Sequence, residues 1–442
     1  MLRTLDNVDW KSLEHAYGSA EDVPDLIRQL LSQDAKVRSD VMWHLYGNVF
    51  HQGTRYPATP YVIPFLIELC SNPDILDRGE ILRFWGSLIT GYFSVQERPT
   101  WGDGTHIYFC GEIQEGDDDD PYSEALHQIY RNSLSAKELL FRLLTDEEVS
   151  VRAGAAWVLA CLPTLGDPLI DRLRSQLRRE ANGWVRAAIA FSLGEIGDSD
   201  SLRQILGSDT EHPAARCMAA CELARISPRD ELIEPLLGFI CEPIAGYDNV
   251  PGAGGESTGD AAFSITYLPP EVRQHAVPAI CERLEHARSF ATMPLVAALL
   301  SAAFEQREEP LTRFNELQRL VLLAMLNAQE LWSIGNLHWT FQSYGLPHDR
   351  EECAQLLGVQ VTKDEAFSEL SIAVTYSDMG FLEKARQGIE KALELDPTVF
   401  ARIPKPDECW LFCAKAFAET DPERAVKTYD NARSINPNIG DR

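Results

Sequence analysis

One short phrase recurs along the chain and limits what it can fold into. The phrase places a valine or alanine before an arginine and then a run of small residues, and it opens an apolar helical stretch after a turn. Three copies stand at 151–156, 185–188 and 215–220, and weaker copies surround Arg38, Arg78 and Arg273. The three clear copies place their arginines 34 and 30 residues apart. A fixed period in this range predicts an all-α solenoid, in which each helix pair packs only on its neighbours.

Each position of the phrase has a physical role in such an array. The small residues let two helices approach closely, and the valine fills the space between repeats. The arginine at the start of the helix can reach an acidic residue in the turn of a neighbouring repeat. We therefore predict that these arginines are structural and form a ladder along the array. The predicted ladder consists of Arg38, Arg152, Arg186, Arg216 and Arg273.

The phrase, opening a second helix after a turn that bears Asp or Glu, resembles the HEAT repeat. The resemblance is in register over 136–226 and implies a superhelical array that serves as a binding scaffold. The N-terminal stretch around Leu45-Tyr46-Gly47-Asn48 and His51-Gln52-Gly53-Thr54 is similar to bacterial HEAT-repeat proteins, some of which look like immunity or accessory partners.

The chain divides into four regions by pattern. Residues 1–135 predict HEAT-like pairs with an acidic, glycine-bearing insertion at about 98–122. Residues 136–290 predict regular repeats interrupted at about 242–270 by a glycine-rich insertion that we expect to be flexible or ordered by a partner. Residues 291–360 remain helical but lose the phrase. Residues 361–442 differ again.

The last region resembles two tetratricopeptide repeats. Small or apolar residues fall at the packing offsets of a 34-residue unit, including Ala373, Ala385 and Ala392, and a second unit follows. Glu369 replaces the usual aromatic residue of the family, and Ala373 replaces a glycine. Two such units are fewer than the three usually needed for stability, so we expect them to pack on the preceding helices.

The charge of the chain restricts its partners. Its 40 basic and 67 acidic side chains give a formal net charge of −27. Such a surface repels nucleic-acid phosphates and anionic lipids, and it favours a partner protein with a basic surface. We therefore expect no binding to nucleic acid and no binding to membranes.

Several features indicate the cytoplasm. Ten cysteines are scattered without a regular framework, as expected for reduced thiols. The first ten residues carry acids where a signal peptide needs an apolar run, so we expect no export. The longest apolar stretch, 291–304, is shorter than the roughly 20 residues that cross a bilayer.

Candidate contact residues lie mainly in the insertions. Trp101 is the tryptophan that we expect outside the helical core, since the others mostly have core spacing. His51 and Gln52 stand where the first helix pair meets the second; the alternative is that Gly53 simply ends a helix in left-handed geometry, with His51 facing the helix dipole. Negative charge for a basic partner comes from an unbroken acidic run in the first insertion, which consists of Asp117, Asp118, Asp119 and Asp120.

The sequence motifs give little support for a cofactor site or a metal site. Cys217 and Cys221 share one helix, but a zinc site needs three or four converging ligands. The acidic run lacks the spacing of a calcium loop. The glycines at 252–259 lack the lysine of a phosphate-binding loop. We expect no cofactor, no metal and no catalytic residue.

Two functions of different classes remain. The first is a non-enzymatic protein-interaction scaffold of the bacterial cytosol, such as an immunity or accessory protein, that uses its concave face and both insertions. The alternative is an enzyme on a HEAT array, such as a bilin-lyase-like protein or, against the charge, an alkylpurine DNA glycosylase-like protein.

Overall fold

The chain is an all-α protein built from stacked helix pairs, a HEAT-like α-solenoid, in a computed structural model. The structure describes residues 1–51, 53–91, 121–285, 287, 291–307, 309–311, 313–335, 337–359, 366, 369–370, 373, 382–397, 399, 417 and 422–435. Two compact units divide the chain, unit 1 over Met1–Ala279 and unit 2 over Ile280–Arg442.

Unit 1 contains most of the repeats. Its helices are α1 (Val23–Gln29), α2 (Ala35–Asn48), α3 (Thr59–Ser71), α4 (Arg78–Thr90), α5 (Pro121–Ser135), α6 (Lys137–Leu143), α7 (Val149–Ala160), α8 (Asp167–Arg179), α9 (Gly183–Glu195), α10 (Ser199–Leu206), α11 (Pro213–Ile226), α12 (Ile233–Cys241), α13 (Ser257–Ile265) and α14 (Pro270–Arg273). The next helix, α15 (Val277–Leu284), crosses the boundary between the units.

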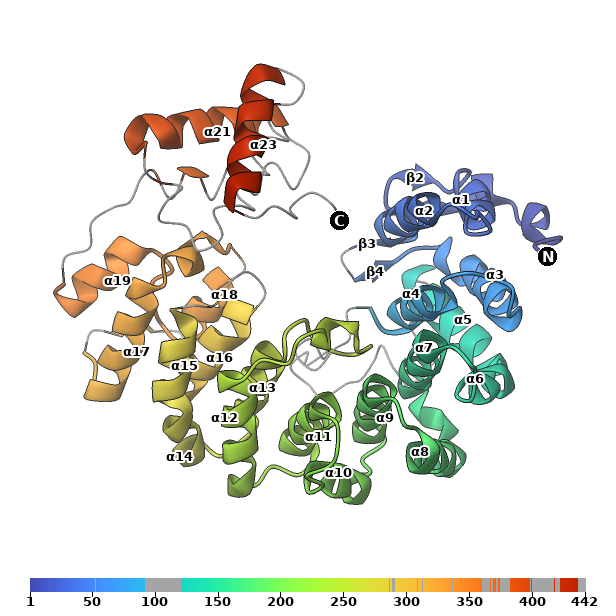
Figure 1. Cartoon of the computed structure of the whole chain (residues 1–442), viewed down its shortest axis with the longest axis horizontal. Helices are drawn as coiled ribbons and strands as arrows, with labels where there is room; N and C mark the ends of the chain where they lie inside the picture. Colours follow the sequence, from blue (N-terminus) through green and yellow to red (C-terminus); the bar gives the residue numbers. More distant parts are fainter. Residues whose placement is uncertain are drawn as a thin grey trace. The chain divides into compact units, whose positions relative to one another are not determined.

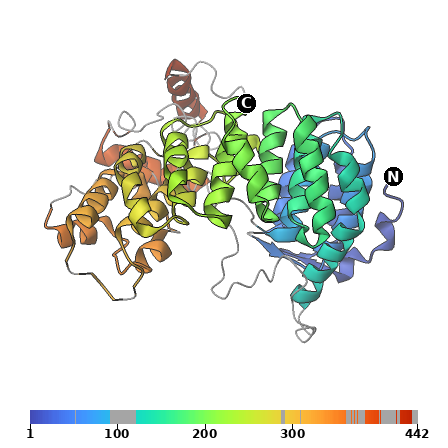
Figure 2. The ribbon, with the colours of Figure 1, turned by 90° about the horizontal axis from the view of Figure 1, so that it is seen from below.

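Within unit 1 the helix pairs form two layers. The second helices of the pairs, α2, α4, α7, α9, α11 and α13, form the inner layer, and their partners form the outer layer (Figure 1). Figure 2 shows the pairs of the middle repeats standing side by side. The recurrent arginine phrase opens helices of the inner layer, as its position after a turn predicts.

Small residues explain how closely the inner helices pack. A Cβ atom at Gly86 of α4 would overlap the indole ring of Trp157 on α7, and one at Gly154 would lie 2.8 Å from the Cβ of Leu82. Caps fix where the helices begin. Asn182 accepts hydrogen bonds from the backbone N–H groups of residues 184 and 185, and Asp34 accepts one from Lys36.

Three local features differ from the sequence prediction. β3 (Phe50–His51) and β4 (Thr54–Arg55) pair as a two-stranded hairpin, so Gly53, with φ of +84°, turns a hairpin instead of ending a helix. A similar hairpin pairs β1 (Glu14–His15) with β2 (Gly18–Ser19). Helix α5 follows the first insertion and was not predicted; its Ser133 Oγ accepts a 2.8 Å hydrogen bond from the Trp85 indole.

The second insertion is shorter and more ordered than predicted. Helix α13 occupies Ser257–Ile265, inside the 242–270 interruption, and completes the pair begun by α12. The remaining segment includes the short 3₁₀ turn Tyr247–Asn249 and buries Tyr247 and Val250. The expectation of a flexible or partner-ordered insertion is therefore wrong, because its apolar residues pack against the chain itself.

Unit 2 is also helical. Its described helices after α15 are α16 (Thr292–Ala303), α17 (Glu316–Asn327), α18 (Leu337–Gln342), α19 (Arg350–Leu357), α21 (Leu382–Leu395) and α23 (Pro422–Ile435). Ala373, Ala385 and Ala392, three of the predicted packing positions, share one buried core. Glu369, which stands in place of an aromatic residue, pairs with Lys391. The tetratricopeptide identity of this region stays a prediction.

Candidate functional site

A ladder of arginines connects successive repeats of unit 1. Three of them, Arg38, Arg152 and Arg186, each donate to a backbone carbonyl in the turn of their own repeat and to a carboxylate in the turn of the next. Arg152 donates to the Asp146 carbonyl at 2.9 Å and, through Nε, to Glu180 at 2.8 Å. Arg186 donates to the Glu180 carbonyl at 3.0 Å and forms an ion pair with Glu211. This arrangement fixes the spacing of the pairs and leaves these guanidinium groups bound within the array.

The same geometry holds at the N-terminal end, with one addition. Arg38 donates to Asp77 at 2.6 Å and to the Ser32 carbonyl at 2.8 Å. Arg78, only a weak echo in the sequence, has a side chain that is 4% exposed and binds Asp146 with two hydrogen bonds of 2.8 and 2.9 Å. The Arg78 bonds place α4 beside α7 although α5 and the first insertion separate them in sequence.

Two predicted ladder members differ. Arg216 donates to the Leu206 carbonyl in its own repeat at 3.3 Å, and Arg273 donates to the Leu268 carbonyl at 2.6 Å. Among the described residues, Arg216 forms no ion pair. An acid partner for Arg216 was therefore a wrong expectation, and the reason is that its next turn is replaced by the long segment after α12.

Two of the ladder acids, Glu180 and Glu211, have lowered pKa values. Burial raises the pKa of Glu180, but the hydrogen bonds from Arg152, the Asn182 N–H and Gln176 outweigh it and hold the pKa below the ordinary value. Burial also raises the pKa of Glu211, but the hydrogen bonds from Arg186 and the His212 N–H outweigh it and hold this pKa below its ordinary value. These carboxylates thus remain ionised below the pH at which they would protonate in the unfolded chain.

We expect the ladder to lose stability in acid. A carboxylate with a lowered folded pKa stabilises the fold above its unfolded pKa of about 4.3, and this contribution disappears as the pH falls through the folded value. The Arg186→Ala variant should therefore be less stable than wild type by about 1 kcal/mol at pH 7, and the two should converge toward pH 3. Urea unfolding at a series of pH values measures this; a gap that widens in acid contradicts it.

A hollow of about 400 Å³ opens between α2 and α4. We call it the Trp43 groove. It is lined by Leu30, Ala35, Arg38, Ser39, Met42, Trp43, Tyr46, Leu76, Asp77, Glu80 and Ile81. Its walls combine apolar and aromatic side chains with Arg38 and two acids, and the apolar and aromatic part of this lining suits an apolar partner residue.

The walls of the Trp43 groove are held in place by packing and by the ladder. Tyr46 stacks edge-on against Phe84 at 4.7 Å between ring centroids, so α2 and α4 are joined behind the groove. Asp77 has a left-handed backbone, with φ of +55°, that is uncommon for a residue with a side chain, and its carboxylate holds Arg38. The side chains of Asp77 and Glu80 are 50% and 62% exposed; Asp77 is paired with Arg38, and Glu80 lies 4.0 Å from Arg83.

Trp43 itself is exposed. It is 78% exposed, although the helical spacing of the tryptophans predicts most of them in the core and Trp101 outside it. The spacing within α2 could have revealed this, because Arg38, Val41 and Leu45 mark the buried face and Trp43 falls off it. Trp339, on α18, is 72% exposed and corrects the same expectation in unit 2.

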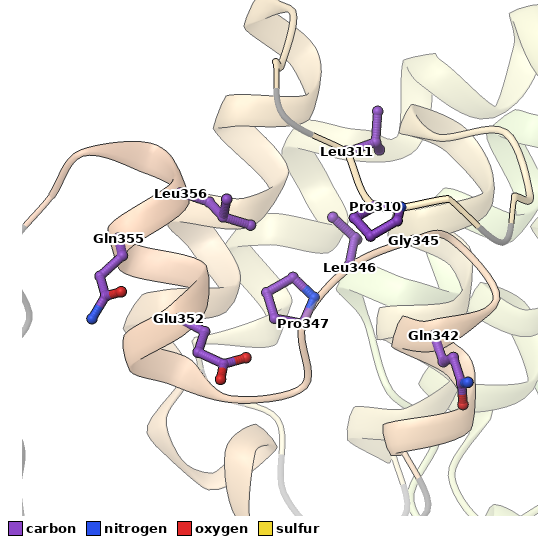
Figure 3. A pocket seen from close by; sticks show the side chains of 9 residues that line it. All are labelled: Pro310, Leu311, Gln342, Gly345, Leu346, Pro347, Glu352, Gln355 and Leu356. Carbon is purple, nitrogen blue, oxygen red and sulfur yellow. The ribbon is translucent and has the colours of Figure 1, made fainter.

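Unit 2 contains a second hollow, of about 560 Å³ (Figure 3). It is lined by Pro310, Leu311, Gln342, Gly345, Leu346, Pro347, Glu352, Gln355 and Leu356. An extended segment forms one side, where the Leu311 N–H donates to the Gly345 carbonyl at 3.1 Å. Prolines and leucines dominate the lining, with one carboxylate at the edge.

The remaining predicted contact residues do not form a described site. His51 lies in the β3–β4 hairpin, with its ring edge-on to Tyr17 at 5.7 Å between centroids. The inner face near α9, part of the predicted concave contact surface, is covered by the segment after α12, since a Cβ at Gly252 would lie 2.9 Å from the Phe191 ring. The other predicted contact residues lie outside the described residues, so their role stays a prediction; they are Gln52, Trp101, Asp117, Asp118, Asp119 and Asp120.

The cysteines behave as core residues. Within the part of the chain that the structure describes, all cysteines are free, and Cys70, Cys161, Cys217, Cys221 and Cys353 are buried. Burial raises the pKa of Cys281 to about 11 and that of Cys353 to about 12. The described residues contain no group of three His, Cys, Asp or Glu side chains that could bind a metal. Among them, every helix is too short or too polar to cross a bilayer.

Comparison with known proteins assigns no function to the chain. No protein-family model and no curated protein matches the chain. Two crystal structures of importin beta are 13% identical, with TM-scores of 0.33 and 0.31, and are matched over 92% and 94% of this chain and 60% and 62% of theirs. An engineered protein is 16% identical, with a TM-score of 0.27, over 93% of this chain and 99% of that one. The chain spans about 60% of the length of importin beta, and no function is transferred from these matches.

Proposed function

We propose that the protein is a scaffold that binds another protein at the Trp43 groove and that the contacting surface of the partner is basic. Arrays of stacked helix pairs are typical of protein-interaction scaffolds, because they present long, pre-formed surfaces. The observation that carries the proposal is Trp43, an exposed tryptophan at a formed hollow with two acids at its rim.

The chemistry of the groove selects the partner. Tryptophan is among the residues that contribute most at protein interfaces, and its ring face attracts an arginine or lysine side chain. Asp77 and Glu80 line the same groove, and their exposed carboxylates can accept further hydrogen bonds from a basic partner beside the pairs that they form with Arg38 and Arg83. The net charge of −27 steers a basic partner toward the protein from a distance. Further residues are proposed to extend this contact, namely Trp101, Asp117, Asp118, Asp119 and Asp120.

The proposed setting is the bacterial cytosol, in the role of an immunity or accessory protein. The free, mostly buried cysteines support a reducing compartment, and the acidity supports neutralisation of a basic partner. The two hollows named above do not favour the enzymatic alternatives, because mainly apolar side chains line both of them.

We expect Trp43→Ala to remove the partner without unfolding the protein. Its ring is exposed, so truncation should cost the fold less than about 0.5 kcal/mol, whereas loss of an interface tryptophan costs about 2 kcal/mol or more of binding, a factor of roughly 30. Affinity capture from the native host with wild type and Trp43→Ala in parallel measures this. Trp339→Ala is the control, since Trp339 is similarly exposed but lies in unit 2. A protein captured equally by all three contradicts the proposal.

A further inference from the structure

The hollow of unit 2 is pre-formed, because backbone contacts hold one of its walls in place. An extended stretch lies against the turn that follows α18, where the Arg307 N–H donates to the Ser343 carbonyl at 2.9 Å. Further along, the Leu311 N–H donates to the Gly345 carbonyl at 3.1 Å. Gly345 has φ of +67°, and a Cβ there would lie 2.3 Å from the Glu309 carbonyl oxygen, so only glycine allows this approach. The shape of the hollow therefore does not depend on a ligand.

The apolar lining of the hollow suits an aliphatic side chain. Its members are Pro310, Leu311, Leu346, Pro347 and Leu356. Figure 3 shows Leu356 of α19 on the side that faces Leu346 and Pro347. Leu356 is 41% exposed, so apolar surface stays in water until a partner covers it. The two prolines lose no side-chain entropy when they are covered, which lowers the cost of binding.

A charged side chain in the lining has no cation beside it. Glu352 lies one helical turn before Leu356 on α19, and its N–H donates at 2.9 Å to the carboxylate of Asp349, which caps the helix. The Glu352 carboxylate is exposed and forms no ion pair with the residues that the structure describes. Gln342 of α18 lies on the other side of Pro347, and its carboxamide is also exposed (Figure 3). The polar edge of the hollow thus offers an unpaired negative charge and an amide.

The open form of the hollow favours a partner protein over a small molecule. Small-molecule sites bury about 70–90% of the surface of their ligand. Three of the lining side chains here, Gln342, Glu352 and Gln355, are exposed, so the mouth of the hollow is wide. A partner surface that reaches the rim would exclude the water that a small ligand leaves in place.

The spacing of Glu352 and Leu356 sets the peptide pattern that fits. Side chains four residues apart on a helix have Cβ atoms about 5–6 Å apart. In an extended peptide, side chains two positions apart point to the same side and lie about 6.6 Å apart, at roughly 3.3 Å per residue. An aliphatic residue that packs on Leu356 therefore brings the residue two positions away next to Glu352. Arginine is favoured there, because its planar guanidinium binds a carboxylate through two hydrogen bonds.

We infer that the hollow of unit 2 binds an extended segment of a partner protein, in which an aliphatic residue and an arginine stand two positions apart. The aliphatic side chain would cover Leu356, and the arginine would pair with Glu352. The Gln342 carboxamide would bond to the peptide backbone. This site lies in a different unit from the Trp43 groove, and the inference does not rest on that groove.

The test selects phage-displayed random heptapeptides on the full-length protein and measures synthetic copies of the enriched peptides by fluorescence anisotropy. The enriched peptides should carry the aliphatic–x–arginine pattern in one direction or the other. Leu356→Asp should weaken their binding at least about 10-fold, because it places a charge where the aliphatic side chain packs. Leu395→Asp is the matched control and should bind as wild type does, since Leu395 is 46% exposed on α21 and outside the lining. A selection that enriches no peptide sensitive to Leu356→Asp overturns the inference.

Charge reversal tests the role of Glu352 independently of Leu356. Glu352→Arg should weaken the enriched peptides about 10-fold, because repulsion replaces attraction, and copies with glutamate in place of the arginine should bind this variant better than wild type. If Glu352→Arg binds both versions of the peptide as wild type does, the carboxylate has no role and the inference fails. Trp43→Ala should bind the peptides as wild type does, so the two proposed sites succeed or fail separately. Loss of the peptides in Trp43→Ala would place them at the Trp43 groove instead.

Discussion

Gly86→Ala is expected to destabilise unit 1 by about 2 kcal/mol, although alanine is the better helix former. Gly86 lies in the middle of α4, where α4 packs on α7, and a methyl group there would overlap the buried indole of Trp157. Trp157 cannot withdraw without opening a cavity between the two helices. Thermal and urea unfolding of the purified variant measure the loss.

Gly47→Ala is the matched control. Gly47 lies within α2, and a Cβ added there would meet no atom within 4 Å. The same substitution should therefore stabilise the protein by roughly 0.5–1 kcal/mol through helix propensity alone. If both variants shift the stability in the same direction, close packing between α4 and α7 does not have the role described here.

Arg78→Ala is expected to have a second large effect, about 3 kcal/mol of destabilisation. The Arg78 guanidinium is nearly fully buried and makes two hydrogen bonds to Asp146 and one of 3.1 Å to Glu148. Removing it leaves the 15%-exposed side chain of Asp146 without its cation. It also removes the ladder link that joins the repeats on either side of α5 and the first insertion.

Two comparisons separate geometry from charge. Arg78→Lys retains the charge but cannot form the two-pronged contact, so it should recover only a minor part of the loss. Arg131→Ala removes an exposed ion pair with Glu124 and should change the free energy of unfolding by less than about 0.5 kcal/mol. Equal effects of Arg78→Ala and Arg131→Ala would contradict the structural role of the ladder.

The repeat phrase predicted the solenoid because each of its positions has one packing consequence. Small residues at Gly154 and Ala155 are useful only where another helix approaches closely, and the arginine before them requires a nearby acceptor. The sequence could not select that acceptor, since Glu180 and Glu211 are two of many turn acids. The sequence around Arg78 matches the phrase only weakly, although the Arg78 side chain is buried and its two bonds to Asp146 connect α4 with the turn before α7.

Most of the candidate site could not have been predicted from the sequence. The Trp43 groove combines α2 with α4, and its lining spans residues 30 to 81, so no local pattern contains it. The segment between α12 and α13 was predicted to be flexible because of its glycines, whereas Gly252 is small so that backbone can press on Phe191. Tyr247 and Val250, apolar residues inside a glycine-rich loop, were the available signal that this loop packs.

The most direct test of the proposed function is the binding kinetics of the captured partner against wild type, Trp43→Ala and Trp339→Ala at several salt concentrations. We predict that Trp43→Ala weakens affinity about 30-fold, mainly through faster dissociation, while Trp339→Ala matches wild type. We also predict that association slows as salt rises, because the Debye length falls from about 10 Å at 0.1 M to about 3 Å at 1 M. A partner that binds Trp43→Ala as tightly as wild type, at a rate independent of salt, would contradict the account.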